Sequence, residues 1–576
     1  MTDQIFRFGG EGGEGVMSCG ELFTIACARS ALEIYTFLTY PAEIKGGHAW
    51  YQVRVSDQLL LSQGDKLDVL IAFNREAYDR HYKMVRDGGV LVFDNTDFLP
   101  DEDARTIKYP IPFTKIAMEE IGVRLTKNLV ALGALSALFN VPREKLEGLT
   151  REKFGRKGEQ VLQKNLDAIA AGARYVEQHV KKQDTVRIEP PTGRQPKLVL
   201  SGNESLSLGA LAAGLKVYAG YPITPASSIL EWLAKELPKV GGCIVQTEDE
   251  IAALGVVLGA SFAGKKAMTA TSGPGLSLMV EMMGLATMAE LPAVIVDAQR
   301  AGPSTGMPTK TEQADLNLAV FGGHGDSPRI VLALSSVEDC FYGMIRAFNF
   351  AEHYQCPVVV LTDQYLAQRK ATVPKPDLTG VTIESRRVPT TAELAQPYWR
   401  FKITEEYVSP MGVPGMADAF YACTGLEHTE QGALNYEQEN HTKMVDKRYR
   451  KLLGATEQPG IYRTYGTEGP APIGVMGWGS SEGVIREAVA QANAAGIKVT
   501  AFHPKLIHPL PERAIHEWVT QHGVKKLIIP ELNYNGQFAT LLKRHLNHGL
   551  EHIQLNRCGG VPFRPQEILQ QIEKVA

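Results

Sequence analysis

Four segments of the sequence decide the fold, and each begins with a strand-like run that ends in a loop rich in glycine, proline and hydroxyl side chains. They are LKVYAGYPITP (215–225), CIVQTEDEIAALG (243–255), AMTATSGPG (267–275) and AVIVDAQRAGPSTGMPT (293–309). The strand-like runs are apolar with little alternation, which is typical of parallel strands covered on both faces. Helical patterns lie between them, so this part of the chain predicts an α/β structure with a parallel sheet.

The loops of these segments contain the candidate functional side chains. In parallel α/β sheets, ligands bind beyond the carboxyl ends of the strands. The residues in or just after the predicted loops are Thr224, Glu250, Ser272, Arg300 and Thr309. One acid, one cation and several hydroxyl groups are therefore expected to converge at one edge of the sheet.

The composition of the whole chain excludes several classes of protein. At 576 residues the chain is too long for a single core, and its formal net charge is −4. No long run of Lys or Arg occurs, so we expect no nucleic-acid partner. The most apolar stretch, 276–296, is interrupted by Glu281, Glu290 and Pro292, so we expect no membrane span. The absence of a signal-peptide pattern predicts a cytoplasmic protein.

The seven cysteines are scattered and form no Cys-x-x-Cys pair. This pattern predicts neither a disulfide framework nor an iron–sulfur cluster held by this chain alone. A metal site at His428, Glu430 and His441 is a weaker alternative, because their spacing matches no common ligand pattern. We therefore expect no metal ion held by this chain.

Changes in composition along the chain predict three parallel-sheet α/β domains and two connecting segments. The expected boundaries are 1–182 for the first domain, 183–197 for a linker, 198–373 for the central domain, 374–465 for a proline-rich connection and 466–576 for the last domain.

The first domain opens with a glycine-rich loop. The spacing of Gly10, Gly12 and Gly15 matches a dinucleotide-binding fingerprint. Glu11 and Glu14 argue against it, since they would lie against a pyrophosphate. A tight strand-to-helix turn and contact of the loop amides with one group of a larger ligand remain as alternatives. A nucleotide-binding regulatory protein and a non-catalytic scaffold are the hypotheses from other functional classes.

The central motifs resemble those of a known family. YPITP (221–225), EDEIAALG (248–255), TSGPG (271–275) and GPSTG (302–306) occur in this order in a sequence that resembles the 2-oxoacid:ferredoxin oxidoreductases. More narrowly, the chain is similar to alpha subunits of the 2-oxoglutarate enzymes that have a gamma domain fused in front. The resemblance extends over nearly the full length. The motifs outside the central domain are the glycine loop, E-x-K-G-G (43–47), WGS (478–480) and N-x-x-G-Q (533–537).

The resemblance implies a fold for each domain and a reaction for the enzyme. The fold is a gamma domain, a pyrimidine-binding-type domain of thiamine enzymes and a transketolase C-terminal-like domain. The reaction is oxidative decarboxylation of 2-oxoglutarate to succinyl-CoA and CO₂, possible in both directions, with coenzyme A as cosubstrate and ferredoxin as electron acceptor. Pyruvate or a broad range of 2-oxoacids is the alternative substrate class.

The resemblance also implies that the catalytic site is shared. The chain lacks a Gly-Asp-Gly motif for diphosphate, and Gly325–Asp326–Ser327 is interpreted as a turn before a strand. Thiamine diphosphate, Mg²⁺ and one [4Fe–4S] cluster are then expected mainly on a beta-type partner subunit. A dimer of alpha–beta heterodimers is the expected assembly.

Residue roles follow from the same resemblance. Glu250 is expected to bond the aminopyrimidine ring of the cofactor, although Thr247-x-x-Glu250 also has the spacing of a helix capping box. Arg300 is expected to bind the C1 carboxylate, with Thr224 and Thr309 donating hydrogen bonds. A surface ion pair for Arg300 and turn positions for both threonines are the alternatives.

The remaining candidates are less specific. Further cofactor contacts are expected from Tyr221, Pro222 and Ser272. The far carboxylate of 2-oxoglutarate needs a cation, for which the candidates are Lys310, Lys45 and His48, unless these face solvent. Lys45 stands where many gamma domains have arginine. The residues that either contact coenzyme A or form a purely structural loop are Gly10, Gly12, Gly13 and Gly15.

Overall fold

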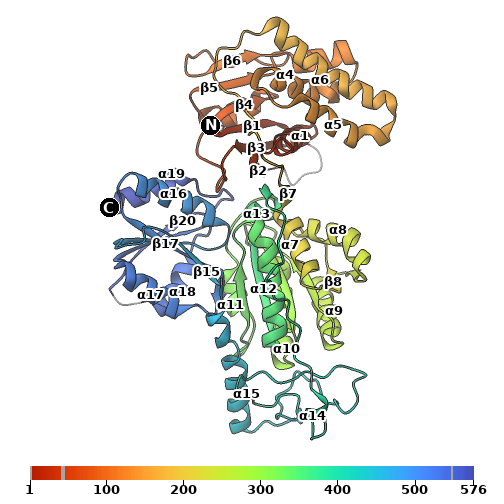
Figure 1. The fold of residues 1–576 in the computed structure, drawn as a ribbon, viewed down its shortest axis with the longest axis vertical. Coiled ribbons are helices and arrows are strands. Elements are labelled where there is room, and N and C mark those ends of the chain that lie inside the picture. Colours follow the sequence, from red (N-terminus) through yellow and green to blue (C-terminus); the bar gives the residue numbers. More distant parts are fainter. Residues whose placement is uncertain (1–2, 40–45, 547–548) are drawn as a thin grey trace. The chain divides into compact units, whose positions relative to one another are not determined.

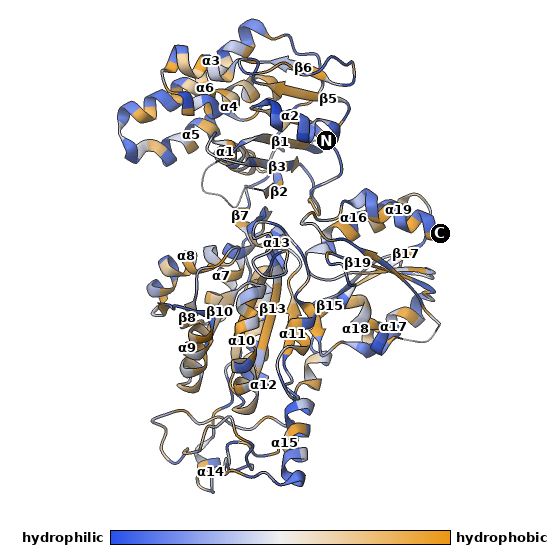
Figure 2. Cartoon of the chain, turned by 180° about the vertical axis from the view of Figure 1, so that it is seen from behind, coloured by the Kyte–Doolittle hydropathy of each residue, from blue (hydrophilic) through white to orange (hydrophobic). Residues whose placement is uncertain are grey.

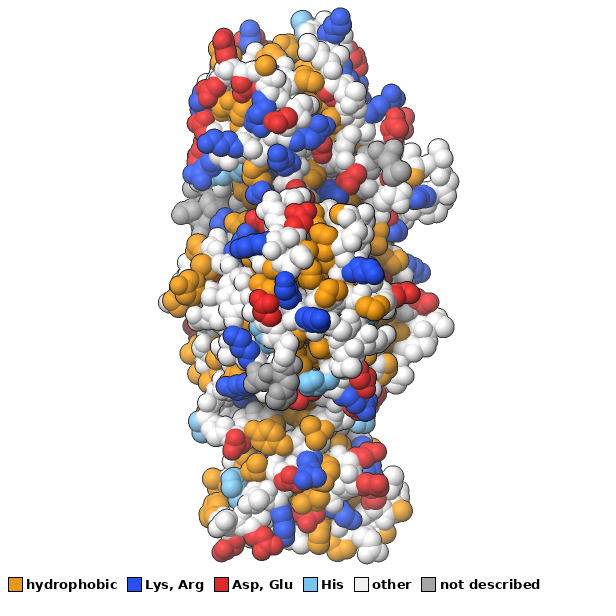
Figure 3. All heavy atoms as spheres, turned by 90° about the vertical axis from the view of Figure 1, so that its left-hand side faces the viewer, with side chains coloured by type: hydrophobic (Ala, Val, Ile, Leu, Met, Phe, Trp, Pro, Cys, Tyr) orange, Lys and Arg blue, Asp and Glu red, His pale blue; other side chains and the backbone are white. Residues whose placement is uncertain are grey.

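The computed structural model describes residues 3–39, 46–546 and 549–576. The chain forms two compact units. One comprises residues 1–200 together with 369–375, and the other comprises 201–368 together with 376–576 (Figure 1). Within the described residues, no helix is both long and apolar enough to cross a membrane. On the face shown in Figure 3, basic and acidic side chains are intermixed.

The first unit is built on an eight-stranded sheet of order β6-β5-β4-β1-β3-β2-β14-β7. Its elements are β1 (Asp3–Glu11), α1 (Val16–Ala28), β2 (Glu33–Thr39), β3 (His48–Ser56), β4 (Leu67–Ala72), α2 (Arg75–His81), β5 (Val85–Phe93), β6 (Ile107–Pro110), α3 (Phe113–Ile116), α4 (Lys127–Phe139), α5 (Arg143–Phe154), α6 (Glu159–His179), β7 (Leu198–Ser201) and β14 (Lys370–Val373).

This sheet is mixed, whereas the sequence predicted a parallel one. The pairs β1–β4, β4–β5 and β5–β6 are parallel, but the pairs β1–β3, β2–β3 and β14–β2 are antiparallel. The physical reason is the short connection from β2 to β3. A parallel pair needs a crossover of a dozen or more residues, which 40–47 does not provide.

Helices α4 and α6 cross with their backbones almost in contact. A Cβ added to Gly172 would lie 2.8 Å from the carbonyl carbon of Val130, and one added to Gly133 would lie 2.8 Å from that of Ile169. Glycine at both positions lets the two helices approach to this distance, and their other buried faces join the core of the unit.

Strand β14 belongs to the first unit although it is encoded after the whole central sheet. Ala371 pairs with Tyr35 of β2, and Lys370 Nζ lies 2.5 Å from Glu21 Oε1 on α1. The Thr372 hydroxyl donates to Glu33 at 2.6 Å. The sequence had placed residues 370–373 at the end of the central domain; the contacts assign them to the first sheet.

The second unit contains two sheets. Its elements are α7 (Gly202–Ala212), β8 (Val217–Gly220), α8 (Ser227–Glu236), β9 (Cys243–Gln246), α9 (Glu250–Phe262), β10 (Ala267–Thr271), α10 (Gly273–Met288), β11 (Ala293–Gln299), α11 (Leu316–Phe321), β12 (Ile330–Ala333), α12 (Val337–Tyr354), β13 (Pro357–Asp363), α13 (Gln364–Gln368), α14 (Thr391–Leu394), α15 (Gln438–Arg450), β15 (Tyr462–Gly466), β16 (Ile473–Met476), α16 (Glu482–Ala494), β17 (Val499–Pro504), β18 (Leu506–His508), α17 (Glu512–His522), β19 (Lys526–Glu531), α18 (Gln537–His545), β20 (Glu551–Asn556) and α19 (Pro565–Val575).

The central sheet has the order β18-β12-β13-β11-β10-β8-β9, and all pairs except β18–β12 are parallel. Helices α9, α10 and α11 pack on one face, and α7, α8 and α12 on the other. Figure 2 shows the strands of this sheet as hydrophobic and α15 as largely hydrophilic. The α/β class with a parallel central sheet is therefore confirmed.

The C-terminal sheet, β15-β17-β16-β19-β20, is parallel except for its edge strand β15. It is joined to the central domain, since β18 extends the central sheet and Lys505 forms a buried ion pair with Asp339. This explains why the central and C-terminal parts form one compact unit. The other predicted boundaries stay predictions.

The connection at 374–465 contains more structure than the sequence indicated. Helix α15 packs against the segment that follows α10, and buried charged side chains form the contact. Glu290 lies 2.5 Å from Lys447 Nζ and 3.0 Å from Lys451 Nζ, and all three side chains are buried. Arg400 donates to the Glu290 carbonyl at 2.8 Å.

Candidate functional site

The strand order predicts a ligand-binding crevice between β8 and β10. The connection from β8 runs to β9 on one side, whereas the connection from β10 runs to β11 on the other, and parallel α/β sheets bind ligands at such a reversal. Thr224 follows β8, Glu250 begins the helix after β9, and Ser272 follows β10. The predicted convergence of these loops at one edge of the sheet is therefore observed.

Arg300 directly follows β11 and points toward the loop after β8. Its Nη1 donates to the carbonyl oxygen of Thr224 at 2.7 Å, while its buried Nε has no hydrogen-bond partner. Burial lowers the pKa of Arg300, and the nearby Asp315 partly opposes this effect. The structure thus brings Arg300 and Thr224 together and leaves a guanidinium with unused donor capacity, which suits a carboxylate ligand.

Glu250 is the first residue of α9 and is 6% exposed. The helix is capped by Asp249, whose side chain accepts from the Ala252 amide at 2.7 Å. The Thr247 hydroxyl instead donates to the Asp249 carbonyl at 2.9 Å. The capping-box alternative for Glu250 is therefore wrong, because the N-cap residue of α9 is Asp249 and not Thr247.

Gly275 provides the space that Glu250 occupies. A Cβ added there would lie 2.5 Å from Glu250 Oε1 and 2.6 Å from its Cγ, and closer still to the hydroxyl of Thr271. Any residue with a Cβ would displace the carboxylate. The glycine of the TSGPG motif is thus explained by a close approach of the Glu250 side chain.

The remaining predicted cofactor contacts lie around this point. Ser272 is fully buried, and its Oγ has no hydrogen-bond partner. Tyr221 is 40% exposed, and Pro222 is also exposed. These three positions flank the crevice, and their roles stay predictions.

The loop after Arg300 returns to the same edge. Thr309 is buried, and the Lys310 amide donates to the Met307 carbonyl at 3.0 Å. The Lys310 side chain packs against the C-terminal domain, where a Cβ added to Gly560 would lie 2.9 Å from its Cγ. This contact partly covers Lys310, which is neither buried nor fully exposed.

Two C-terminal motifs hold the end of this loop. Gln313 Nε2 donates to the Trp478 carbonyl at 2.8 Å, and Asn533 Nδ2 donates to the Gln313 carbonyl at 2.9 Å. Gln537 donates to the Ala314 carbonyl at 2.7 Å. The WGS and N-x-x-G-Q motifs therefore act locally by fixing the segment that follows Thr309.

Sequence reasoning missed a buried acidic pair beneath the site. Asp297 on β11 is fully buried, and neither carboxylate oxygen has a hydrogen-bond partner. Burial, with Asp315 adding to it, raises the pKa of Asp297 well above its usual value. Burial and Glu312 raise the pKa of Asp315 to about 6, although Arg300 opposes the rise. An acid inside the apolar run AVIVDAQ was the signal that could have revealed the pair.

In the first unit, the glycine loop is occupied by the chain's own carboxylate. Glu14 accepts hydrogen bonds from the Glu11 amide at 2.8 Å and from Asn74 at 3.1 Å, and it lies 2.5 Å from Lys127 Nζ. The Gly12 amide donates to the Gly47 carbonyl at 2.8 Å. An internal anion therefore fills the place where the dinucleotide hypothesis put a pyrophosphate.

The loop glycines have geometric roles. Gly13 and Gly15 have positive φ, and a Cβ on Gly15 would lie 3.0 Å from Asn128 Cγ. A Cβ on Gly10 would lie 2.7 Å from Glu14 Oε2. The tight-turn interpretation agrees with the backbone of Gly13 and Gly15, whereas Gly10 leaves room for the Glu14 side chain. Contact with coenzyme A stays a prediction.

His48 begins β3 and contacts another histidine. Its Nε2 lies 2.7 Å from His81 Nε2, while Arg7 Nη1 lies 3.1 Å from His81 Nδ1. Burial, together with the charge of Arg7, lowers the pKa of His81 to about 2. Lys45 lies outside the described residues. The proposed roles of His48 and Lys45 toward substrate are untested.

The alternative metal residues have separate partners. His428 Nδ1 lies 2.8 Å from the Leu426 carbonyl, Glu430 accepts from the Ile403 amide at 2.7 Å, and His441 pairs with Glu427 at 2.6 Å. In the described ranges, no group of three or more acids, histidines and cysteines is arranged to hold a metal ion.

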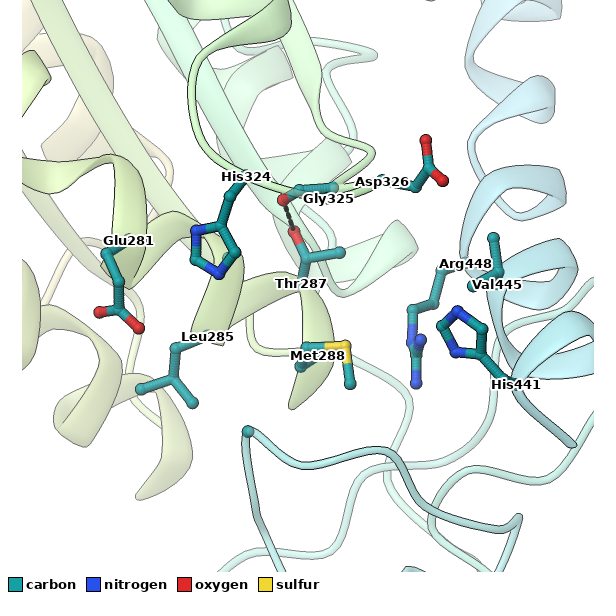
Figure 4. Close-up of a pocket in the computed structure, with 13 residues that line it drawn as sticks. Glu281, Leu285, Thr287, Met288, His324, Gly325, Asp326, His441, Val445 and Arg448 are labelled. Atoms are coloured by element: carbon teal, nitrogen blue, oxygen red, sulfur yellow. Dashed lines mark hydrogen bonds between the residues drawn. The ribbon is translucent and has the colours of Figure 1, made fainter. Parts of the chain in front are cut away.

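A cavity of about 360 Å³ lies at the far end of α10, lined by residues of that helix, the 324–327 loop and α15 (Figure 4). Its walls include His324, Asp326, His441 and Arg448. Gly325–Asp326–Ser327 precedes β12, as predicted for a strand-leading turn. The cavity adjoins Thr287, three turns along the helix from Gly275, so it is separate from the crevice.

Comparison with known proteins agrees with this geometry. The sequence models of one family match three regions. "Pyruvate ferredoxin/flavodoxin oxidoreductase" matches residues 5–175, "Pyruvate flavodoxin/ferredoxin oxidoreductase, thiamine diP-bdg" matches 208–447, and "Pyruvate:ferredoxin oxidoreductase core domain II" matches 471–568. The 2-oxoglutarate oxidoreductase subunit KorA of Mycobacterium tuberculosis is 34% identical over 99% of this chain and 91% of its own length.

The chain belongs to the 2-oxoacid:ferredoxin oxidoreductase family.

Two further similar proteins are an alpha subunit and a solved enzyme structure. The alpha subunit of 2-oxoacid:ferredoxin oxidoreductase 2 of Aeropyrum pernix is 32% identical over 95% of this chain and 93% of its own. A solved structure, the 2-oxoglutarate:ferredoxin oxidoreductase from Magnetococcus marinus with 2-oxoglutarate, coenzyme A and succinyl-CoA bound, is 44% identical. It aligns with a TM-score of 0.95 over 100% of this chain and 99% of that one. The predicted family and gamma-fused alpha-subunit type are thereby confirmed, and the subunit names imply a multi-subunit complex.

The residues at the crevice fit the pyrimidine half of thiamine diphosphate. Glu250 is a largely buried carboxylate that is left free of capping, and Gly275 leaves room beside it. The buried, unpartnered hydroxyl of Ser272 is a further polar group for a ligand. Bound there, the cofactor would supply the chemistry that cleaves the bond to a departing carboxyl group. The roles of Glu250 toward its ring and of Arg300 toward a substrate stay predictions.

Proposed function

We propose that this chain is the gamma-fused alpha subunit of a 2-oxoglutarate:ferredoxin oxidoreductase that acylates coenzyme A. The products are succinyl-CoA and CO₂, and the electrons pass to ferredoxin. The single observation that best supports the substrate is the 44% identity, over the whole chain, to an enzyme described with 2-oxoglutarate and succinyl-CoA bound. We further propose that its functional domains are the predicted gamma, pyrimidine-binding-type and C-terminal domains.

Arg300 acts as the ligand of the substrate C1 carboxylate. Its position at the end of β11 and its hydrogen bond to Thr224 fix the guanidinium, so less side-chain freedom is lost on binding. Thr224 and Thr309 donate hydrogen bonds to the carboxylate or the 2-oxo oxygen. The buried surroundings strengthen each of these interactions relative to water.

Glu250 hydrogen-bonds the aminopyrimidine ring of the cofactor and holds or releases a proton at the ring nitrogen. Its burial beside Gly275 excludes bulk water from that proton. Tyr221, Pro222 and Ser272 complete the pyrimidine side.

The diphosphate, its Mg²⁺ and the [4Fe–4S] cluster are held by a beta-type partner subunit. The sequence has no Gly-Asp-Gly motif and no Cys-x-x-Cys pair. The complex is a dimer of alpha–beta heterodimers in the cytoplasm. Co-purification of the chain from its native cell tests this directly, since an iron-bearing partner that also binds thiamine diphosphate should come with it. Stoichiometric iron in the purified single chain would refute the shared site.

The substrate assignment is tested by comparing kcat/KM for 2-oxoglutarate and pyruvate in the assembled complex. Lys310, Lys45 and His48 are proposed ligands of the far carboxylate. Lys310→Met and Lys45→Met should lower kcat/KM for 2-oxoglutarate while leaving that for pyruvate little changed. A parent complex that prefers pyruvate would contradict the 2-oxoglutarate assignment and leave the family assignment intact.

A further inference from the structure

The hydroxyl of Thr271 lies beside the carboxylate of Glu250. Thr271 is the last residue of β10 and is fully buried. Both Thr271 Oγ1 and Glu250 Oε1 lie within 2.5 Å of the point where a Cβ on Gly275 would stand, so they are at most about 5 Å apart. The two oxygens are therefore close enough to interact directly or through one water molecule.

The hydroxyl of Thr271 is weakly engaged elsewhere. It donates to the Ser272 carbonyl at 3.3 Å, near the upper limit for an O–H donor. In the described part of the chain, no hydrogen bond is made to the carboxylate of Glu250. A small rotation of the Thr271 hydroxyl would exchange a long bond to a neutral carbonyl for a stronger bond to a carboxylate.

Asp297 lies on the strand next to Thr271. The two residues are register partners on the parallel strands β10 and β11, and their side chains project from the same face of the sheet. Asp297 has no exposed surface and no hydrogen-bond partner on either oxygen. A carboxyl group so buried is neutral, and its proton needs an acceptor. The hydroxyl of Thr271, its register partner, can accept this proton on the same face of the sheet, as can the paired Asp315.

These positions define one direction for the hydrogen bonds. The Asp297 carboxyl donates to Thr271 Oγ1, and the Thr271 hydroxyl donates to the inner oxygen of Glu250. A hydroxyl group can accept and donate at the same time, which neither valine nor alanine can do. The outer oxygen of Glu250 is then left for the cofactor ring.

We propose that Thr271 is a positioning residue for Glu250, oriented in turn by Asp297. The inference rests on the proposed function for the role of Glu250, but the contact itself is a property of this chain. Gly275 and Thr271 act together: the glycine admits the carboxylate and the threonine fixes its direction.

The test compares Thr271→Val, which keeps the shape and removes the hydroxyl, with Thr271→Ser, which keeps the hydroxyl. In the full chain without partner, infrared difference spectra against Glu250→Gln isolate the carboxylate stretching bands of Glu250. These bands should shift in the valine variant and stay in place in the serine variant. Asp297→Asn keeps a donor at that position and should leave them in place.

In the assembled complex, the valine variant should lower kcat by about 10- to 100-fold, the range for one hydrogen bond to a charged group. The KM for the 2-oxoacid should stay unchanged, because Thr271 does not contact substrate. The acidic limb of the kcat–pH profile should move to higher pH in the valine variant only. The serine variant should keep both kcat and the pH profile close to those of the parent.

Unchanged carboxylate bands in Thr271→Val would overturn the proposal, and so would equal losses in the valine and serine variants. A band shift in Asp297→Asn as large as that in Thr271→Val would overturn the part assigned to Asp297. If the parent complex oxidises no 2-oxoacid, the proposed function fails, while the infrared comparison still decides whether Thr271 orients Glu250.

Discussion

Replacing Gly275 with alanine should inactivate the enzyme without unfolding it. The added methyl carbon would lie 2.5 Å from Glu250 Oε1 and 2.6 Å from its Cγ. Non-bonded carbon contacts are normally about 3.5 Å, so a displacement of about 1 Å is required. The Thr271 hydroxyl would lie closer still, at 2.0 Å, so it must rotate away as well. Both side chains are therefore displaced, and the Glu250 carboxylate loses its position.

The cost to turnover can be estimated from that displacement. Misplacement of a catalytic group by about 1 Å costs about 10²-fold in rate. The effect on stability is smaller, because the gain from replacing a helical glycine, about 1 kcal/mol, offsets part of the overpacking cost of about 1–3 kcal/mol. We expect kcat to fall about 10²-fold while the melting temperature changes by a few degrees.

The assay measures kcat, KM and the melting temperature on one preparation of the assembled complex. Gly148→Ala in α5 is the matched control, because a Cβ at this helical glycine meets nothing within 4 Å. The control should keep full activity and melt at the same temperature or higher. Normal turnover in Gly275→Ala would refute the argument that this glycine determines the position of Glu250.

Four further outcomes are expected. Glu250→Gln should lower kcat by about 10²–10⁴-fold with little change in melting temperature. Asp249→Ala removes the residue that caps α9 and should lower the free energy of unfolding by about 0.5–2 kcal/mol. Similar losses of melting temperature in both variants would contradict the assignment of Asp249, and not Glu250, as the cap. Arg300→Lys should raise KM for all 2-oxoacids, since a lysine replaces the forked guanidinium by a single charge, and an unchanged KM would exclude Arg300 as the carboxylate ligand. Gly172→Ala should destabilise the first unit by about 1–3 kcal/mol, seen as a lower melting temperature beside an unaffected Gly148→Ala. Asp315 has a pKa raised to about 6 in the folded chain, so its contribution to stability is complete below about pH 4 and is lost as the pH rises to about 6. The melting temperature of Asp315→Asn should therefore fall less than that of the parent between about pH 4 and pH 7, and parallel curves would argue against this pKa.

The central sheet and its ligand-binding edge could be predicted because their determinants are local. Apolar runs, glycine-rich loops and helical patterns alternate from 215 to 309, and each places its loop at the carboxyl end of a strand. Thr224 and Arg300 were expected to meet, and the hydrogen bond between them agrees with that expectation.

Other features depend on contacts between distant residues, which periodicity does not encode. Strand β14 was assigned to the wrong sheet, since nothing within KATV indicates that its partner is β2. Spacing suggested a capping box at Glu250, and only the geometry showed that Asp249 accepts from the helix amide instead. Helix α15 lies in a segment that the sequence predicted only as a proline-rich connection, because Glu290, the partner of its lysines, lies far away in sequence.

The position of β14 has a consequence for dividing the gene. A polypeptide ending in the 183–197 linker would lack two strands of its own sheet, β7 and β14, and both would remain in the other product. The two halves would then act as complementing fragments, with the shorter one recruiting residues 369–375 through the open edge of β2. A split within the linker is thus a split inside a folded unit. If the two halves were expressed separately, the folding of the N-terminal half would depend on the presence of the C-terminal half.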